Sequence, residues 1–281
     1  MKIILYLFIS FVITLVTNVS LADPLDRILA RGSLKVCALA DRLPFSSRNG
    51  NPKGIQIELA EEISKELGVE LEITWLRYRF HARKAACDMV MEAVSRKDDD
   101  EEKRNIDGAR PLTRAGDSNK KNRKTLPPKA SIPIVKVETY LVGYDEKIRN
   151  KDSVDKLKGM SVGVMNRSWS HMLMQKNGVH YRTKFVTEAE LMQGVADKEV
   201  DAIFVSSMQY WWYLKNNPDV KLSVLKNFDF EREVSLNVGV LMRGPDQVTV
   251  VRINEILSNL LDQGVIENIY ASYGIKYVAP N

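Results

Sequence analysis

Compact apolar runs alternate with segments of helical periodicity along most of this chain. Leu34–Leu39 is an apolar run between turn residues, and Ile55–Leu67 has apolar residues four apart before Gly68. Val69–Trp75 alternates as a strand does, and Cys87–Val94 is again compact and apolar. This β-α-β order favours a parallel sheet with right-handed crossovers. The sequence therefore predicts an α/β fold.

A second series of predicted strands and helices begins near Gly143. Its strands are expected at Met160–Met165, Arg182–Val186, Val200–Val205 and Lys221–Leu225, with short helices between them. A last strand, Glu233–Leu241, precedes an amphipathic helix pair within Val251–Tyr273. The two series suggest two sheets.

The first residues are typical of a secretory signal peptide. Lys2 precedes an uncharged apolar run over residues 3–16, and Ser20-Leu21-Ala22 supplies the small residues of a cleavage site. The run has about 14 residues, whereas a bilayer-spanning helix needs about 20. We expect residues 1–22 to be removed, with a permanent membrane anchor as the alternative. The mature chain would then lie in the periplasm of a Gram-negative cell, without stable membrane insertion.

The charge balance is only mildly basic. Lys and Arg number 41 and Asp and Glu 36, a formal net charge of +5. Because no basic helix or aromatic–basic stripe accompanies this excess, nucleic acid is not an expected partner, whereas an acidic protein surface would suit it. His81, His171 and His180 are scattered without metal-ligand spacing, so we expect no metal and no other cofactor.

Residues 95–129 differ in composition from the rest of the chain. They contain the runs DDDEEKR and GARPLTRAGDSNKKNRK and almost no large apolar residues. Such a segment cannot bury enough apolar surface to offset its ordering entropy. We predict an exposed charged loop, with a lid or docking arm as a functional alternative.

The terminal helix pair reads N-E-x-L-x-x-L-x-x-x-G-x-I-E-x-I-x-x-x-Y-G, which resembles the terminal signature of family 3 extracellular solute-binding proteins. Other matches, in order, are PLDRILARGSLKVCA, Leu43–Ser46, Ile55–Gly68, Lys158–Val164 and Val200–Ile203. The resemblance implies a two-lobed periplasmic binding protein-like fold of type II, each lobe a mostly parallel sheet flanked by helices. Lobe 1 would comprise residues 23–140 plus 236–281, and lobe 2 residues 141–235.

A narrower resemblance involves two cysteines. Leu34–Ala38, Leu43–Ser46 and Cys87–Met91 are similar to the MxaJ/XoxJ-type branch, whose members accompany quinoprotein (PQQ) alcohol dehydrogenases. Members of that branch typically carry cysteines at these two strand positions, which implies a Cys37–Cys87 disulfide. Two buried free thiols are the alternative that the apolar surroundings permit.

The resemblance also suggests cleft residues. An amino acid ligand needs an Arg for its carboxylate and an acid for its ammonium group. The family Arg would fall near Arg123-Lys124, and the acid position holds Ser206-Ser207, so the ammonium partner is missing. Residues 166–169 could hold an anion at a helix N-terminus, or a serine there could simply cap the helix. The cleft candidates are Asp41, Phe45, Ser95, Ser131, Arg167, Ser168, Trp169 and Ser206.

Aromatic residues gather at two places. Tyr210-Trp211-Trp212-Tyr213 cannot place all four rings in one core if the segment is helical, so we expect at least one ring to be exposed or to line the cleft. Trp75 and Tyr78 form a second group beside basic residues. Core packing is the alternative for most of these rings. The partner-surface candidates are Trp75, Tyr78, Tyr210, Trp211 and Trp212.

Two functional classes follow from the resemblance. The expected function is that of an accessory protein of a PQQ-dependent methanol or alcohol dehydrogenase in the periplasm. The alternative is the substrate-binding component of an ABC transporter, which would deliver a small polar solute, such as an amino acid or organic acid, to its permease. The sequence lacks the arrangement of a Ser/His/Asp site and a G-x-S-x-G motif, so we do not expect an enzyme. A dehydratase of the same fold is a remote possibility.

Overall fold

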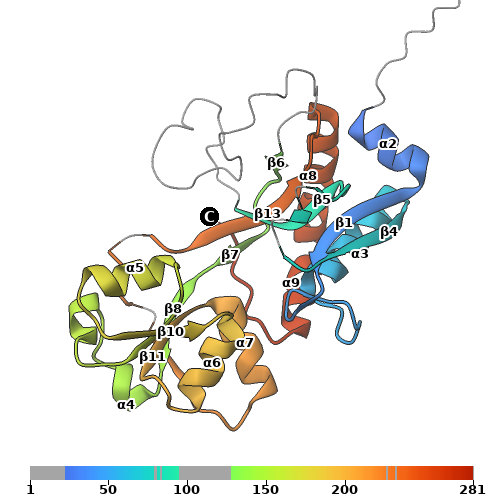
Figure 1. Cartoon of the computed structure of the whole chain (residues 1–281). Coiled ribbons are helices and arrows are strands. Elements are labelled where there is room, and N and C mark those ends of the chain that lie inside the picture. Colours follow the sequence, from blue (N-terminus) through green and yellow to red (C-terminus); the bar gives the residue numbers. More distant parts are fainter. Residues whose placement is uncertain are drawn as a thin grey trace, which may run out of the picture.

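The computed structural model describes residues 23–78, 81–82, 84–94, 128–225, 227–231 and 233–280. Two sheets form two bodies, which are joined by extended segments of the chain (Figure 1). Each sheet packs its own helices, and the buried apolar residues separate into one main cluster in the first body and two in the second. The protein therefore has the two-lobed α/β architecture predicted from its sequence.

The sheet of lobe 1 combines both ends of the chain. Its strand order is β4-β1-β5-β13-β6, and β7 also pairs with β13. β1 is parallel to β4 and β5, whereas β13 is antiparallel to its neighbours. The sheet is therefore mixed: β4, β1 and β5 are parallel, and the pairs that involve β13 are antiparallel. The strands are β1 (Ser33–Leu39), β4 (Glu70–Leu76), β5 (Met89–Val94), β6 (Lys129–Ala130), β7 (Val135–Val137) and β13 (Leu236–Met242).

In the described part of the chain, the helices that belong to lobe 1 are α2 (Pro24–Arg31), α3 (Ile55–Leu67), α8 (Gln247–Asp262) and α9 (Val265–Ser272). Gly32 and Gly68 end α2 and α3, each with a φ of 70° that favours glycine. Helices α3, α8 and α9 contribute to one core, in which Ile63 and Leu257 are fully buried. The terminal helix pair therefore belongs to the same body as the N-terminal strands.

Lobe 2 has the strand order β10-β9-β11-β8-β12. Its strands are β8 (Thr139–Gly143), β9 (Val162–Met165), β10 (Tyr181–Phe185), β11 (Ala202–Ser206) and β12 (Ser223–Leu225). β9 is parallel to β10 and β11, and β8 is antiparallel to β11 and β12. The helices are α4 (Asp145–Ile148), α5 (Trp169–Lys176), α6 (Glu188–Ala196) and α7 (Ser207–Asn216), with a 3-10 turn at Val154–Leu157.

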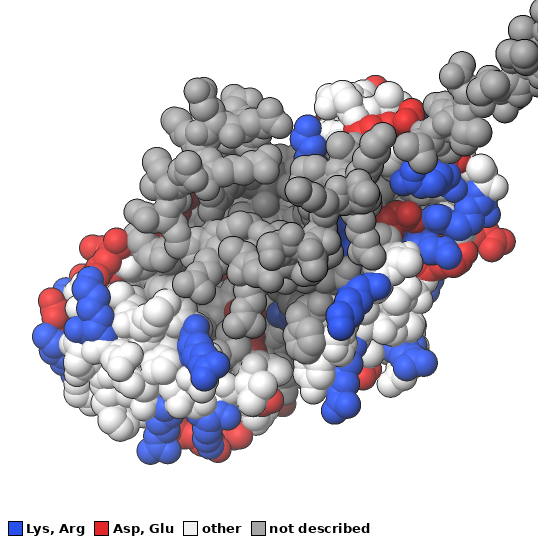
Figure 2. All heavy atoms as spheres, turned by 45° about the horizontal axis from the view of Figure 1, so that its top comes forward, with Lys and Arg blue, Asp and Glu red and all other residues white. Residues whose placement is uncertain are grey.

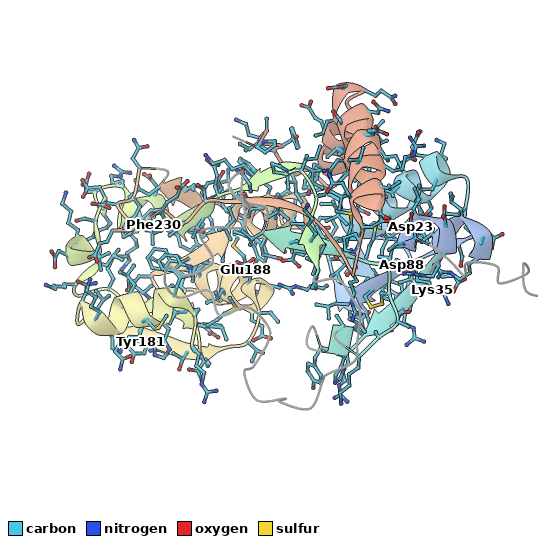
Figure 3. All side chains as sticks on the ribbon, turned by 90° about the horizontal axis from the view of Figure 1, so that it is seen from above. Asp23, Lys35, Asp88, Tyr181, Glu188 and Phe230 are labelled. Carbon is cyan, nitrogen blue, oxygen red and sulfur yellow. A yellow bond between two sulfur atoms is a disulfide. The ribbon has the colours of Figure 1, made fainter. Side chains whose placement is uncertain are left out.

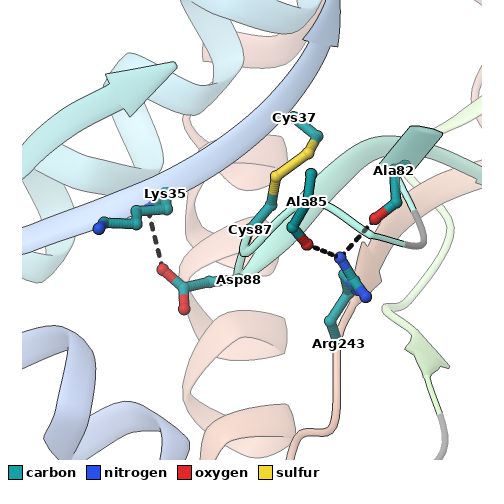
Figure 4. The surroundings of a disulfide bond; sticks show 7 residues. All are labelled: Lys35, Cys37, Ala82, Ala85, Cys87, Asp88 and Arg243. Carbon is teal, nitrogen blue, oxygen red and sulfur yellow. Dashed lines mark hydrogen bonds between the residues drawn. A yellow bond between two sulfur atoms is a disulfide. The ribbon is translucent and has the colours of Figure 1, made fainter. Parts of the chain in front are cut away.

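A disulfide joins Cys37 and Cys87, with their Cα atoms 5.7 Å apart (Figure 4). Both cysteines are buried beside Leu76 in a small apolar cluster. Asp88 accepts a hydrogen bond from the Lys35 backbone N–H at 2.8 Å, which fixes the segment before β5 against β1. The predicted bridge is confirmed, and the alternative of free thiols is wrong.

Some predicted segments lie outside the described residues. These are the signal peptide 1–22 and residues 95–127, which include Ser95, Arg123 and Lys124 and most of the predicted charged loop. Among the described residues between β4 and β5, His81 and Ala82 adopt a helical turn.

Candidate functional site

The carboxyl ends of parallel strands in lobe 2 define one edge of its sheet. β9, β10 and β11 lead into α5, α6 and α7, so three helices begin at this edge. Ligands of open α/β sheets usually bind outside the carboxyl ends of the strands. Each helix is capped by a hydroxyl that accepts a backbone N–H: Ser168 from His171 at 3.1 Å, Thr187 from Glu190 at 3.1 Å and Ser206 from Gln209 at 3.4 Å.

Glu188 lies at this edge beside Ser206, as the first residue of α6. Its carboxylate accepts two hydrogen bonds from Ser206, one from the backbone N–H at 3.0 Å and one from Oγ at 2.6 Å. Burial raises the pKa of Glu188, and the hydrogen bonds from Ser206 act in the opposite direction. The edge thus holds a half-buried carboxylate that is oriented by its neighbour.

The charges that act on Glu188 from a distance come from lobe 1. The Arg42 guanidinium lowers the pKa of Glu188, and the Glu92 carboxylate raises it. Arg42 follows β1 and Glu92 lies on β5. Seen from above, Glu188 lies on the side of lobe 2 toward lobe 1, whereas Tyr181 and Phe230 lie farther out (Figure 3). Glu188 therefore faces the other lobe.

The opposing edge of lobe 1 is formed by the loop after β1. Here β2 (Asp41–Arg42) pairs with β3 (Ser46–Ser47) in a small hairpin. Asp41 is exposed, and Phe45 is half-buried with the Arg42 guanidinium 5.7 Å from its ring centroid. The hairpin therefore brings a carboxylate, a guanidinium and an aromatic ring to the end of β1.

The loop after β1 also accepts the hydrogen bonds of the first backbone N–H groups of α3. The carbonyls of Pro44 and Phe45 accept the N–H groups of Ile55 and Gln56 at 2.9 and 2.8 Å. The first amides of α3 are therefore engaged within lobe 1.

The structure removes Ser131 from the cleft candidates. Ser131 is 4% exposed, and its Oγ donates to the Ile132 carbonyl at 2.7 Å and accepts the Val240 N–H at 2.9 Å. The hydroxyl thus stabilises the approach to β13 beside Gly239, where a Cβ would lie 2.7 Å from Ser131 Oγ. The prediction that Ser131 meets a ligand is wrong because its hydrogen-bonding capacity is used within the lobe.

Residues 167–169 have three different roles. Arg167 is exposed with a φ of 61°, and its backbone N–H donates to His171 Nδ1 at 3.0 Å. Ser168 is the helix cap, which was one of the two alternatives for this turn. The Trp169 ring packs against Phe204 and Phe230 in the core of lobe 2. Of the three, Arg167 has the side chain most available to a solute.

The aromatic run on α7 is divided between the lobes. Tyr210 is 5% exposed within lobe 2, and its hydroxyl donates to the Leu222 carbonyl at 3.1 Å. It is therefore not a partner-surface residue, contrary to prediction. Trp211 and Trp212 are half-buried; Trp212 packs against the core of lobe 1, and Trp211 packs against the cores of both lobes.

The other aromatic group is more accessible. Tyr78 is 48% exposed, with the Arg77 guanidinium 5.4 Å from its ring centroid and the His81 ring at 5.6 Å. Trp75 is half-buried on β4. Tyr78 is thus the predicted partner-surface residue that the structure leaves most exposed.

Sequence reasoning missed Glu188. The resemblance places an acid at position 206, where this chain has a serine. In the structure, Glu188 of α6 brings a carboxylate to this position, where it accepts two hydrogen bonds from Ser206. The strand order places β10 and β11 on either side of β9, so residues that follow them share one edge. A glutamate at the start of a helix after a parallel strand was the available signal, but the sequence alone did not reveal the strand order.

The described surface carries both signs of charge over both lobes, without a single basic stripe on the face shown in Figure 2. Among the described residues, no three metal-binding side chains come together. The same part of the chain has no helix that combines the length and hydropathy needed to cross a bilayer.

Comparisons with known proteins agree with this architecture. The model of the bacterial extracellular solute-binding proteins, family 3, matches residues 34–118. A curated relative, a probable histidine-binding protein from Neisseria gonorrhoeae, is 22% identical over 250 residues, which are 86% of this chain and 83% of the relative.

Two solved structures have the same fold. An ancestral cationic amino acid solute-binding protein superposes with a TM-score of 0.67 at 21% identity, over 89% of this chain and 99% of that one. The periplasmic binding protein XoxJ from Methylobacterium extorquens AM1 gives 0.61 at 18% identity, over 88% and 100%. The chain is thus similar to family 3 solute-binding proteins over residues 34–118, and it shares the two-lobed type II fold of these solved structures.

Proposed function

We propose that this chain is a periplasmic solute-binding protein that holds a small solute with a protonated amino group between its lobes. Glu188 is the counter-ion of that amino group, and Ser206 orients it. The exported location agrees with the extracellular family whose model matches residues 34–118. A membrane permease of an ABC transporter would receive the solute.

The observation that carries this proposal is the environment of Glu188. Glu188 is half-buried, and a carboxylate that has lost part of its hydration is stabilised by a cation. Its two hydrogen bonds from Ser206 leave acceptor capacity on both oxygens, because an ionised carboxylate has about four lone-pair sites. An ammonium group supplies both the charge and the donors.

The facing residues of lobe 1 suit the rest of such a solute. Asp41 and Glu92 add negative charge, and Phe45 offers an aromatic surface. Arg42 and Arg167, one from each lobe, provide guanidinium groups that can meet a solute carboxylate bidentately. This combination favours a cationic or zwitterionic solute. Histidine and a cationic amino acid are named for two similar proteins.

A second function has its own support. The Cys37–Cys87 bridge joins the two strands at which the MxaJ/XoxJ-type branch carries cysteines, and XoxJ shares the fold. Under this alternative, the chain is an accessory of a periplasmic PQQ-dependent methanol or alcohol dehydrogenase, and exposed Tyr78 belongs to the contact surface.

Thermal-shift measurements separate the two functions. The purified mature chain is tested against L-arginine, L-lysine, L-histidine and putrescine, with glutarate and succinate, which have no amino group, as anionic controls. A bound solute at about 100 times its Kd should raise the Tm by about 5–10 °C. A selective shift with one or more cationic solutes supports the proposal, and a shift with the anionic solutes alone contradicts it.

The accessory function is tested by adding the chain to a PQQ-dependent methanol dehydrogenase. A saturable change in that enzyme's rate, lost in Tyr78→Ala, together with no shift from any cationic solute, favours the accessory over the transporter component. Glu92→Gln serves as a control on lobe 1 because it removes charge from the solute-facing edge and leaves Tyr78 in place.

A further inference from the structure

Helix α7 belongs to lobe 2 by sequence, but two of its faces are buried in different lobes. Tyr210 and Tyr213 lie in the core of lobe 2. Met208, on the other face, is 2% exposed and forms part of the core of lobe 1. An amphipathic surface helix normally buries one stripe, so the second buried face of α7 needs its own explanation.

The contacts with lobe 1 continue along the helix. Trp211 and Trp212 pack against the same core as Met208, and the Trp212 ring centroid lies 5.7 Å from that of Tyr273. Tyr273 is itself fixed, because its hydroxyl donates to Glu58 at 2.5 Å and accepts the Gly54 N–H at 2.6 Å. The indole of Trp212 thus rests on an anchored part of lobe 1.

Both ends of α7 are also tied by hydrogen bonds. At the start, the Ser207 N–H donates to the Glu138 carbonyl at 2.8 Å, and the Glu138 N–H donates to Ser207 Oγ at 3.2 Å. Glu138 lies between β7 and β8, where the chain passes from one lobe to the other. The first turn of α7 is therefore fixed to a crossing segment.

At the other end, Lys215 Nζ donates to the Ser272 carbonyl at the end of α9. Gly274 lies directly under the Lys215 side chain, since a Cβ at Gly274 would be 2.7 Å from Lys215 Cδ. Contacts with lobe 1 consequently extend from the first turn of α7 to its last.

We infer that α7 sets the orientation of the two lobes relative to each other. A row of contacts along one helix resists sliding, twisting and rotation of lobe 2, because each of these motions separates Met208 and Trp212 from lobe 1. The apolar face formed by Met208, Trp211 and Trp212, here called the interlobe face, therefore keeps the two lobes in register. This inference does not depend on which solute or partner binds.

Interlobe distances measured by pulsed electron paramagnetic resonance test whether the interlobe face fixes this orientation. Spin labels are attached through Lys65→Cys on α3 and Lys176→Cys on α5, whose side chains are 74% and 71% exposed. The native cysteines are engaged in their disulfide and do not take a label. The parent chain should give one narrow distance distribution. Met208→Ala and Trp212→Ala should each broaden it and shift its mean.

Leu214→Ala is the matched control, because Leu214 is half-buried on the lobe 2 side of the same helix. It should lower the Tm and leave the distance distribution unchanged. If Met208→Ala does not fold, Trp212→Ala and Lys215→Ala decide, since both side chains are partly exposed. Folded interlobe-face variants whose distance distributions match that of the parent would overturn the inference, as would equal broadening by Leu214→Ala.

Discussion

Ser206 donates two hydrogen bonds to Glu188, from Oγ to one carboxylate oxygen at 2.6 Å and from the backbone N–H to the other at 3.0 Å. Ser206 also caps α7, so the residue that orients the carboxylate begins the helix that contacts lobe 1. A displacement of Glu188 by a solute would therefore act directly on the first turn of α7.

The raised pKa of Glu188 predicts a pH-dependent stability. Burial raises this pKa above the ordinary value of 4.5, so the folded state binds the proton more tightly than the unfolded state. The resulting stability is fully present below pH 4.5 and is lost as the pH rises through the raised pKa. Glu188→Gln has no such loss. The Tm of Glu188→Gln minus that of the parent should increase across this window, and a constant difference between pH 4 and pH 8 would refute the assignment.

The disulfide should contribute strongly to stability. Cys37 and Cys87 are separated by 50 residues, and constraining a loop of that length in the unfolded chain is worth about 4 kcal/mol. We expect Cys37→Ala/Cys87→Ala to lower the free energy of unfolding by about this amount in urea titrations. The control is the parent chain titrated with urea in the presence of a reductant, which breaks the disulfide without changing the volume of the two side chains. A loss below about 1 kcal/mol in both would show that the bridge adds little.

Gly54 should be far less tolerant of a side chain than Gly50. Both have positive φ, 101° and 80°, but a Cβ at Gly54 would lie 2.5 Å from the Phe45 carbonyl oxygen. Because that atom belongs to the backbone, Gly54→Ala must displace the loop from α3. We expect a loss of about 3 kcal/mol or more. Gly50→Ala, which meets open space, should cost about 1 kcal/mol. Equal losses in chemical denaturation would contradict the close approach.

Local signals predicted much of the fold. The glycine after Leu67 ended α3 at the expected residue, because glycine adopts the left-handed cap without strain. The compact apolar runs marked β1, β5, β9 and β11 to within two residues. The last strand begins at Leu236 and not at Glu233, a boundary for which the alternating pattern gave no sharp signal.

The candidate site was harder to predict because it depends on contacts between distant residues. Ser131 is engaged by Val240, 109 residues away, so nothing in its own sequence neighbourhood showed that its hydroxyl is occupied. We expected at least one aromatic ring of α7 to be exposed or to line the cleft. Trp211 and Trp212 are half-buried where α7 meets lobe 1, and this placement depends on how the lobes meet.

Isothermal titration calorimetry with L-arginine, L-lysine and L-histidine tests the role of Glu188 most directly. Glu190→Gln is the matched control, since Glu190 lies in the same helical turn but is exposed. We expect the parent and Glu190→Gln to bind the same cationic solute alike, and Glu188→Gln to bind it about 30-fold more weakly or worse. Binding by Glu188→Gln equal to that of the parent would contradict the account.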